Sequence, residues 1–211
     1  MKRSIIVLGA GGHAKVVIEI LHAAGYQVSY CVGDDDSPNE CMGIPVLKGD
    51  EQLFRLYDAG YSLVFPAIGS NTIRERAATC AIEIGYELVN AISPYAIVSQ
   101  SLVLGRGVAI MSGVVINAEC KIDDLAIINT GVTVDHDCHI GFCVHIAPQC
   151  ALAGNVKVGK RAFLGIGTTV IPDIIIGNNA ITGAGSVVIS NIPAATIVVG
   201  HPARLLKRSD N

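Results

Sequence analysis

Residues 128–157 read INTGVT VDHDCH IGFCVH IAPQCA LAGNVK, and each group of six opens on an aliphatic residue. This register runs from Ile92 to Val187 without an insertion, through sixteen hexads whose first residue is Ile, Val or Leu everywhere except Thr182. The fifth residue of each hexad is small or medium-sized, and Gly occupies the second place in six of them. A six-residue period matches neither an α-helix nor an alternating strand, so it indicates a repeat architecture.

The period predicts a parallel β-helix (hexapeptide repeat), with one short strand per hexad and three hexads per triangular coil. We expect the aliphatic first residue to point inward and the smaller fifth residue to fill the remaining interior. Gly at the second place is expected to permit the tight corner between strands.

Residues 1–90 show a different pattern, an alternation of apolar strands, Gly-rich turns and helices that is typical of a Rossmann-like α/β domain. Strands are expected at 5–8, 28–32 and 63–68, with helices at 13–24 and from 71 to 84. We therefore predict two domains, an α/β domain over 1–90 and a β-helix domain with a C-terminal tail over 91–211. A short helix is expected in the tail, at 203–207.

Composition excludes several classes of function. The net charge of −3 and the thinly spread basic residues give no nucleic-acid footprint and no polybasic membrane patch. Residues 174–203 carry no charge, but their Pro, Asn and Gly argue against a membrane-spanning helix. Seven Cys without a CxxC pair are expected to be small buried hydrophobes in a reducing cytoplasm.

The loop Gly9-Ala10-Gly11-Gly12-His13 lies between the first strand and the first helix. Glycines allow the backbone to approach a phosphate, and a helix N-terminus supplies N–H donors. A diphosphate site and a simple tight turn both fit this loop. Asp34 and Asp35 follow the second strand, where such folds hold a nucleoside, although a solvated turn fits them as well.

The second chemical feature is His136 followed directly by Asp137. His136 is third in its hexad and should point outward, and Asp137 can raise its basicity and fix its tautomer. Ala118 and Gly154, eighteen residues before and after His136, leave a slot beside the ring. The spacing of His136, His139 and His145 does not favour a metal site, and we expect none.

The chain resembles the bacterial sugar acetyltransferases that join a small nucleotide-sugar domain to a left-handed β-helix, closest to the UDP-4-amino-sugar N-acetyltransferases of the bacillosamine pathway. The resemblance covers nearly the whole chain. It rests on residues 9–13, 67–71 with Ile73-Arg74, 114–118, Asn129-Thr130, His136-Asp137, His145, 153–157, 163–166 and 200–204.

The resemblance implies a role for each matching residue. His136 is the general base and Asp137, where relatives carry Glu, supports it. Gly11, Gly12 and His13 hold the diphosphate. Three further groups are implied: Asp34 or Asp35 with Ile68 and Gly69 near the uracil, His145 at the acetyl thioester, and Gly154, Ile166 and Ala184 along the acetyl-CoA path.

The leading hypothesis is therefore an N-acetyltransferase that uses acetyl-CoA and acts on the 4-amino group of a UDP-4-amino-4,6-dideoxy-sugar. The alternatives are O-acetylation of a sialic acid and a non-catalytic sugar-nucleotide scaffold. His136 and His145 fall on different faces of one coil, so we expect a homotrimer with intersubunit active sites.

Overall fold

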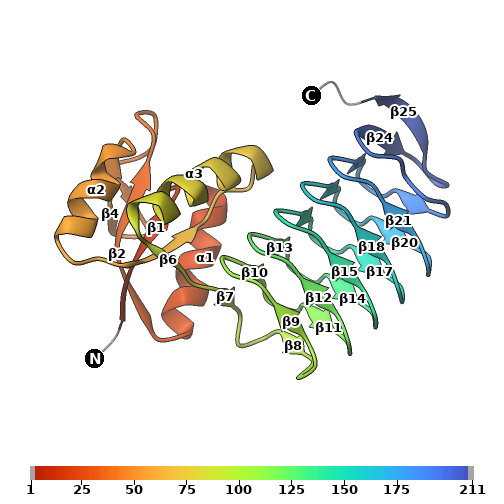
Figure 1. The fold of residues 1–211 in the computed structure, drawn as a ribbon, viewed down its shortest axis with the longest axis horizontal. Coiled ribbons are helices and arrows are strands. Elements are labelled where there is room, and N and C mark those ends of the chain that lie inside the picture. Colours follow the sequence, from red (N-terminus) through yellow and green to blue (C-terminus); the bar gives the residue numbers. More distant parts are fainter. Residues whose placement is uncertain (1–2, 209–211) are drawn as a thin grey trace. The chain divides into compact units, whose positions relative to one another are not determined.

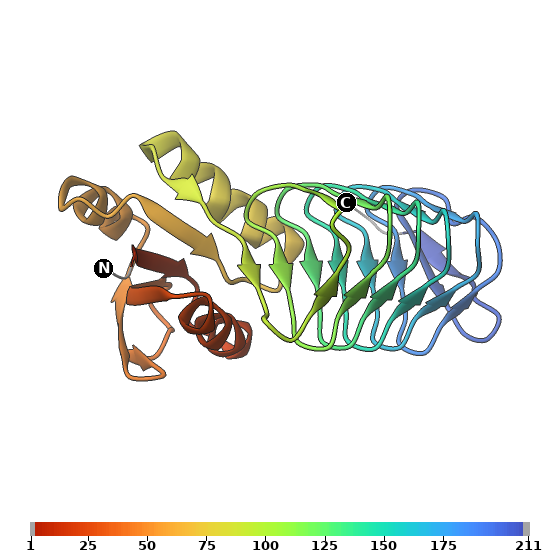
Figure 2. The same ribbon diagram turned by 90° about the horizontal axis from the view of Figure 1, so that it is seen from below.

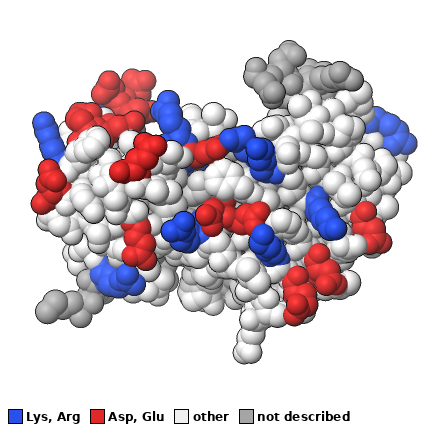
Figure 3. Space-filling model, viewed as in Figure 1, with Lys and Arg blue, Asp and Glu red and all other residues white. Residues whose placement is uncertain are grey.

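The computed structural model describes residues 3–208, and the chain forms two compact units, residues 1–94 and 95–211. Figure 1 shows the helices and strands of each unit as ribbons. Among the described residues no helix is long and apolar enough to cross a membrane. Side chains of both charges are interspersed over the face shown in Figure 3.

The amino-terminal unit is built on a six-stranded sheet in which β1 lies parallel to both β2 and β5. Among the described strands of this sheet, only β3 runs antiparallel, against β4. Across the sheet the strands are β3 (Glu40–Cys41), β4 (Ile44–Lys48), β2 (Tyr26–Gly33), β1 (Arg3–Leu8), β5 (Leu63–Pro66) and β6 (Glu87–Leu88). The helices are α1 (Gly12–Ala23), α2 (Glu51–Asp58) and α3 (Asn71–Ile84), and the short strand β7 (Ala91–Ile92) follows β6.

The three strands and two helices expected in this unit are present as β1, β2, β5, α1 and α3. β1 buries residues 5–8 completely or nearly so, and α1 buries one stripe that includes Val17 and Leu21. Gly85 adopts φ +118 and ends α3, as expected of a glycine at a helix C-terminus. The sequence analysis missed β3, β4 and α2, because β4 carries Pro45 and α2 has only eight residues with an exposed Phe54.

The second unit is the left-handed β-helix, whose two-residue strands stack in three parallel sheets with a spacing of eighteen residues (Figure 2). The first face contains β10 (Ala109–Ile110), β13 (Ile127–Ile128), β16 (His145–Ile146), β19 (Phe163–Leu164) and β22 (Ile181–Thr182). The second contains β8 (Ile97–Val98), β11 (Val115–Ile116), β14 (Thr133–Val134), β17 (Ala151–Leu152), β20 (Thr169–Val170) and β23 (Val187–Val188). The third contains β9 (Val103–Leu104), β12 (Lys121–Ile122), β15 (His139–Ile140), β18 (Lys157–Val158) and β21 (Ile175–Ile176).

The predicted interior register is confirmed. From Val108 to Ser186 every first and every fifth residue of a hexad is buried. At the start of the repeat the burial is incomplete, because Ile92 is 36 % exposed. Thr182, the one polar first residue, shares a hydrogen bond of 2.7 Å between its hydroxyl and that of Thr168, so two interior polar groups satisfy each other.

From the hexad that opens at Leu104 onward, the corner is made differently from our expectation. The residue in the left-handed conformation is the fourth, as at Gly113 (φ +74) and Asp137 (φ +59), and not the second. Gly at the second place instead permits close stacking of coils. A Cβ on Gly141 would lie 2.7 Å from the carbonyl oxygen of Val158, and one on Gly165 would lie 2.6 Å from that of Thr182.

The predicted helix at 203–207 is wrong. The tail forms β24 (Thr196–Val199) and β25 (Arg204–Arg208), which pair antiparallel around Gly200 at φ +100. Extended backbone prevails because β24 is already paired with β22 and offers its other side to β25. Thr182 pairs with Val198, sixteen residues later instead of eighteen, so the last coil is two residues short.

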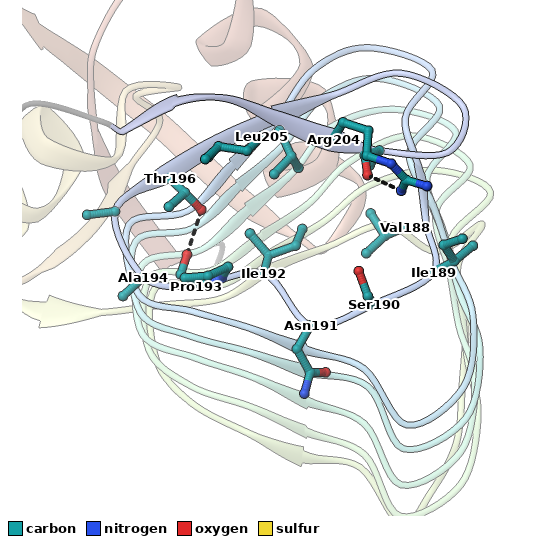
Figure 4. A pocket seen from close by; sticks show the side chains of 13 residues that line it. Val188, Ile189, Ser190, Asn191, Ile192, Pro193, Ala194, Thr196, Arg204 and Leu205 are labelled. Carbon is teal, nitrogen blue, oxygen red and sulfur yellow. Dashed lines mark hydrogen bonds between the residues drawn. The ribbon is translucent and has the colours of Figure 1, made fainter.

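A cavity of about 500 Å³ lies at this end of the β-helix, between the last coil and β25. Figure 4 shows Val188, Ile192 and Leu205 around it, and the Thr196 hydroxyl donating to the carbonyl oxygen of Pro193 at 2.7 Å. Its lining is mainly apolar side chains of the final coil, with Arg204 near its rim.

Candidate functional site

The amino-terminal unit has a cavity of about 770 Å³ at the carboxyl ends of β1, β2 and β5. The chain order reverses there, because β2 and β5 lie on opposite sides of β1, and parallel α/β sheets bind ligands at such a point. All seven residues expected to bind the sugar nucleotide line this cavity: Gly11, Gly12, His13, Asp34, Asp35, Ile68 and Gly69. The structure therefore brings together residues that lie up to 58 positions apart in the sequence.

The glycine loop leaves the N-terminus of α1 open toward this cavity. Gly11 is the N-cap residue and provides no side-chain cap. A Cβ on Gly11 or Gly12 would meet no atom within 4 Å, so the space in front of the helix is clear for a ligand. Gly9 has a different role, because at φ +103 a Cβ there would lie 2.9 Å from the carbonyl oxygen of Ala67. The loop thus offers helix N–H groups to an anion.

The acidic loop after β2 is held in a defined conformation. The hydroxyl of Ser37 donates to Asp34 Oδ1 at 2.6 Å, and Lys48 Nζ donates to the carbonyl oxygen of Asp35 at 2.9 Å. Gly33 leaves room for Ser37, whose Oγ would lie 2.3 Å from a Cβ at that position. The sequence analysis missed the roles of Ser37 and Lys48, since their partners are carbonyl or loop atoms that no motif identifies.

Arg74 fixes the other side of the cavity. Its guanidinium is fully buried and donates to the carbonyl oxygens of Ile68 at 2.9 Å and Gly69 at 3.2 Å, and to Asn71 Oδ1 at 2.8 Å. The resemblance included Arg74 without assigning it a role. Arg76, which the sequence analysis did not single out, lines the cavity and adds a positive charge to it.

In the β-helix, His136 and Asp137 occupy the turn between β14 and β15. His136 Nδ1 lies 2.7 Å from Asp137 Oδ2, and the two side chains are 60 % and 58 % exposed. The hydrogen bond to Asp137 raises the pKa of His136 above its ordinary value, and the charge of Asp135 raises it further. Gly154 stands beside the ring as expected, because a Cβ there would lie 2.6 Å from His136 Cε1.

His145 lies on β16 and is nearly buried. Its Nε2 is 3.2 Å from Asn129 Nδ2, and its ring meets that of Phe163 edge to face with centroids 5.2 Å apart. Asn129 comes from the preceding coil and Phe163 from the following one, so three successive coils define the position of this imidazole.

The β-helix places the expected acetyltransfer residues on two of its three edges. His136, Asp137 and Gly154 share the turns between the second and third faces, which we call the His136 edge. Ile166 and Ala184 lie in the turns that follow first-face strands, beside His145, and we call this the His145 edge. The second face separates the two edges, so one chain does not unite these residues.

Comparison with known proteins bears on this arrangement. Residues 4–80 match the family model of the PglD N-terminal domain, and residues 155–190 match that of the bacterial transferase hexapeptide (six repeats). Over 96 % of both chains, the sequence is 31 % identical to GDP-perosamine N-acetyltransferase from Escherichia coli O157:H7. The chain belongs to the sugar N-acetyltransferase family.

Solved structures of sugar N-acetyltransferases agree with this assignment. Perosamine N-acetyltransferase from Caulobacter crescentus, in complex with CoA and GDP-perosamine, is 48 % identical over 97 % of each chain, with a TM-score of 0.94. The acetyltransferase domain of PglB from Neisseria gonorrhoeae FA1090, in complex with acetyl coenzyme A, is 35 % identical over 98 % of this chain and all of that one, with a TM-score of 0.90. As a member of the family, the chain is an enzyme, an amino-sugar N-acetyltransferase with acetyl-CoA as co-substrate.

Proposed function

We propose that this enzyme transfers the acetyl group of acetyl-CoA to the amino group of a sugar linked to a nucleoside diphosphate, with His136 as the general base. The observation that carries this proposal is the hydrogen bond of 2.7 Å between His136 Nδ1 and Asp137, in an imidazole that lies against Gly154. With Nδ1–H donating to Asp137, Nε2 is left with a lone pair that can accept a proton.

The reaction follows from this tautomer. The amine nitrogen attacks the thioester carbonyl while His136 Nε2 removes its proton. The new C–N bond forms, the C–S bond breaks, and the proton held on His136 passes to the departing CoA thiolate. Because Asp137 stabilises the imidazolium, the proton is transferred without leaving an unpaired charge.

For the nucleotide, the relatives and the cavity favour GDP over the UDP expected from the resemblance. Two relatives, at 48 % and 31 % identity, are named for perosamine carried by GDP. Four carboxylates line the cavity, those of Asp34, Asp35, Asp36 and Asp50. Guanine presents a ring N–H and a 2-amino group to such acceptors, whereas uracil presents a single N–H. We therefore propose a GDP-linked amino sugar, with a UDP-linked one as the second candidate.

The proposed assembly is a homotrimer. Because the His136 edge and the His145 edge of one chain lie on opposite sides of its second face, neighbouring subunits packed around a threefold axis can bring one edge of each kind together. Acetyl-CoA would then run in the groove between them, past Gly154 and Ile166. We propose a cytoplasmic reaction on the basis of these two substrates, acetyl-CoA and a nucleotide sugar.

A turnover screen tests the proposal. The enzyme would receive acetyl-CoA with a GDP-, UDP- or dTDP-linked amino sugar, or with free sialic acid, and release of the CoA thiol would be followed. We expect turnover with the GDP-linked amine, and calorimetry should show GDP binding more tightly than UDP. Turnover of sialic acid alone would establish the O-acetyltransferase alternative, and binding without turnover of any acceptor would support a scaffold.

A further inference from the structure

The side chain of Asp135 connects the His136 turn to the coil that precedes it. Asp135 Oδ1 accepts a hydrogen bond from the backbone N–H of His136 at 2.8 Å. The same oxygen accepts one from Asn117 Nδ2, also at 2.8 Å. Asn117 stands eighteen residues earlier, at the same place in its hexad, so one carboxylate oxygen links two successive coils.

These bonds matter because packing does not hold His136 in place. Its side chain is 60 % exposed and projects from a turn. The turn is held instead by hydrogen bonds, since the N–H of Asp137 donates to the carbonyl oxygen of Ala118 at 3.1 Å. From the interior, the thiol of Cys120 donates to the carbonyl oxygen of Asp135 at 3.0 Å. The bonds to Asp135 fix the backbone directly before the imidazole.

We propose that Asp135 and Asn117 form a positioning pair that holds the backbone of His136 and thereby aims its imidazole at the substrate. The inference rests on the proposed role of His136 as the base. Asp135 differs in function from Asp137, because Asp137 bonds the ring itself while Asp135 bonds the main chain that carries it. An imidazole displaced by about 1 Å loses much of its catalytic effect, which makes this support significant for the rate.

The titratable groups around His136 define what its titration can report. Asp137 and Asp135 flank it in sequence, Cys120 faces it from the interior, and Glu119 occupies the corner of the preceding coil. The following coil contributes Gly154 and Asn155, which carry no charge. The pKa of Asp135 lies below its ordinary value because Asn117 and the His136 N–H donate to it, so it is an anion at neutral pH.

The chain offers a matched control. Asn155 Nδ2 donates to Asp173 Oδ1 at 2.7 Å, across the same spacing of eighteen residues on the same edge. This second link holds no histidine. Asp173→Ala removes this link and reports the structural value of an Asn–Asp link one coil further on. It leaves in place the backbone N–H of Asn155, which donates to the carbonyl oxygen of His136 at 2.9 Å.

The experiment compares Asp135→Ala and Asn117→Ala with Asp173→Ala, using steady-state kinetics and NMR of the full-length protein. The NMR titration of His136, assigned by its loss in His136→Gln, gives the pKa, and the shifts of its two ring nitrogens give the tautomer. We expect Asp135→Ala to lower kcat by ~10-fold or more with little change in KM, and to lower the pKa of His136. Asn117→Ala, which leaves the charge of Asp135 in place, should alter the ring-nitrogen shifts and lower kcat by a smaller factor. Asp173→Ala should leave kcat within about twofold of wild type and the ring-nitrogen shifts of His136 like those of wild type.

The outcomes are distinguishable. The positioning pair is refuted if Asp135→Ala and Asn117→Ala both match wild type in kcat, in the pKa of His136 and in the chemical shifts of its ring nitrogens. If kcat falls while the His136 signals stay unchanged, Asp135 acts elsewhere and the inference is also wrong. If the His136 signals move while kcat does not, the pair positions His136 but His136 is not the base, and the proposed mechanism fails. Thermal unfolding of each variant identifies one that has simply lost its fold, and Asn117→Ala then decides the question.

Discussion

At the scale of single residues, the His136 turn concentrates several unlike contacts in few atoms. Asp137 bonds the imidazole ring, Asp135 bonds the backbone N–H of His136, and the absence of a side chain at Gly154 leaves space for the ring. A single substitution can remove either hydrogen bond or fill the space at Gly154, so the contribution of each feature to kcat can be measured separately.

The first prediction concerns His136 itself. His136→Ala should lower kcat by about two to four orders of magnitude, the usual effect of a general base, with little change in the binding of either substrate. Steady-state kinetics with calorimetry of both ligands measures this, and His139→Ala, on the third face, serves as the control. Turnover like that of wild type would remove His136 from the mechanism.

The second prediction is a pH dependence. His136 acts as a base only when neutral, so kcat/KM should fall as the pH drops below its raised pKa. In Asp137→Ala the largest cause of that raised pKa is gone, so the acidic limb of the profile should move to lower pH. The titration of the substrate amine is the same for both enzymes and cancels in the comparison. An acidic limb that does not move would show that another group sets it.

The third prediction distinguishes Gly154, which leaves space for the catalytic imidazole, from Gly141, which allows successive coils to stack closely. A Cβ on Gly154 would lie 2.7 Å from His136 Nε2, so Gly154→Ala should displace the imidazole and lower kcat with little effect on thermal stability. A Cβ on Gly141 would meet backbone of the next coil, so Gly141→Ala should cost about 1–3 kcal/mol of stability instead. Denaturant unfolding and kinetics of both variants check this, and a reversed pattern would contradict our account of the two glycines.

At the scale of elements, the repeat was predictable in detail because its signal is local and regular. The interior places follow from residue type alone, and so do β1, α1 and α3 in the amino-terminal unit. The glycine and acidic loops could be assigned to one cavity because parallel strands present their carboxyl ends along one side of a sheet.

What escaped prediction depends on contacts between residues far apart. The buried guanidinium of Arg74 binds carbonyl oxygens of a loop, and Lys48 does the same across the strands. Neither bond has a sequence motif. The tail was assigned to a helix because its pairing partner β24 lies outside the register of six, after the shortened coil. In both cases the partners are backbone atoms. Every residue type carries the same backbone atoms, so the sequence gives no sign of such a pairing.

At the scale of the whole molecule, the separation of the two edges leads to the fourth prediction. If the active site combines His136 of one subunit with His145 of the next, mixed trimers of His136→Ala and His145→Ala chains should regain part of the activity that each variant lacks. Co-refolding at several ratios, with sedimentation to count subunits, measures this. Each parent must be inactive alone. A fully active monomer, or hybrids without any recovery, would rule out the shared site.

The shortened last coil has a consequence for how this protein behaves at high concentration. A β-helix that ended on a complete coil would present a flat rung of unpaired backbone groups, on which a second molecule could continue the stack. Here the final turn closes two residues early and β25 pairs antiparallel with β24, so the first-face sheet does not offer an incoming coil a matching parallel strand. We therefore expect the tail to oppose end-to-end stacking of molecules through this face.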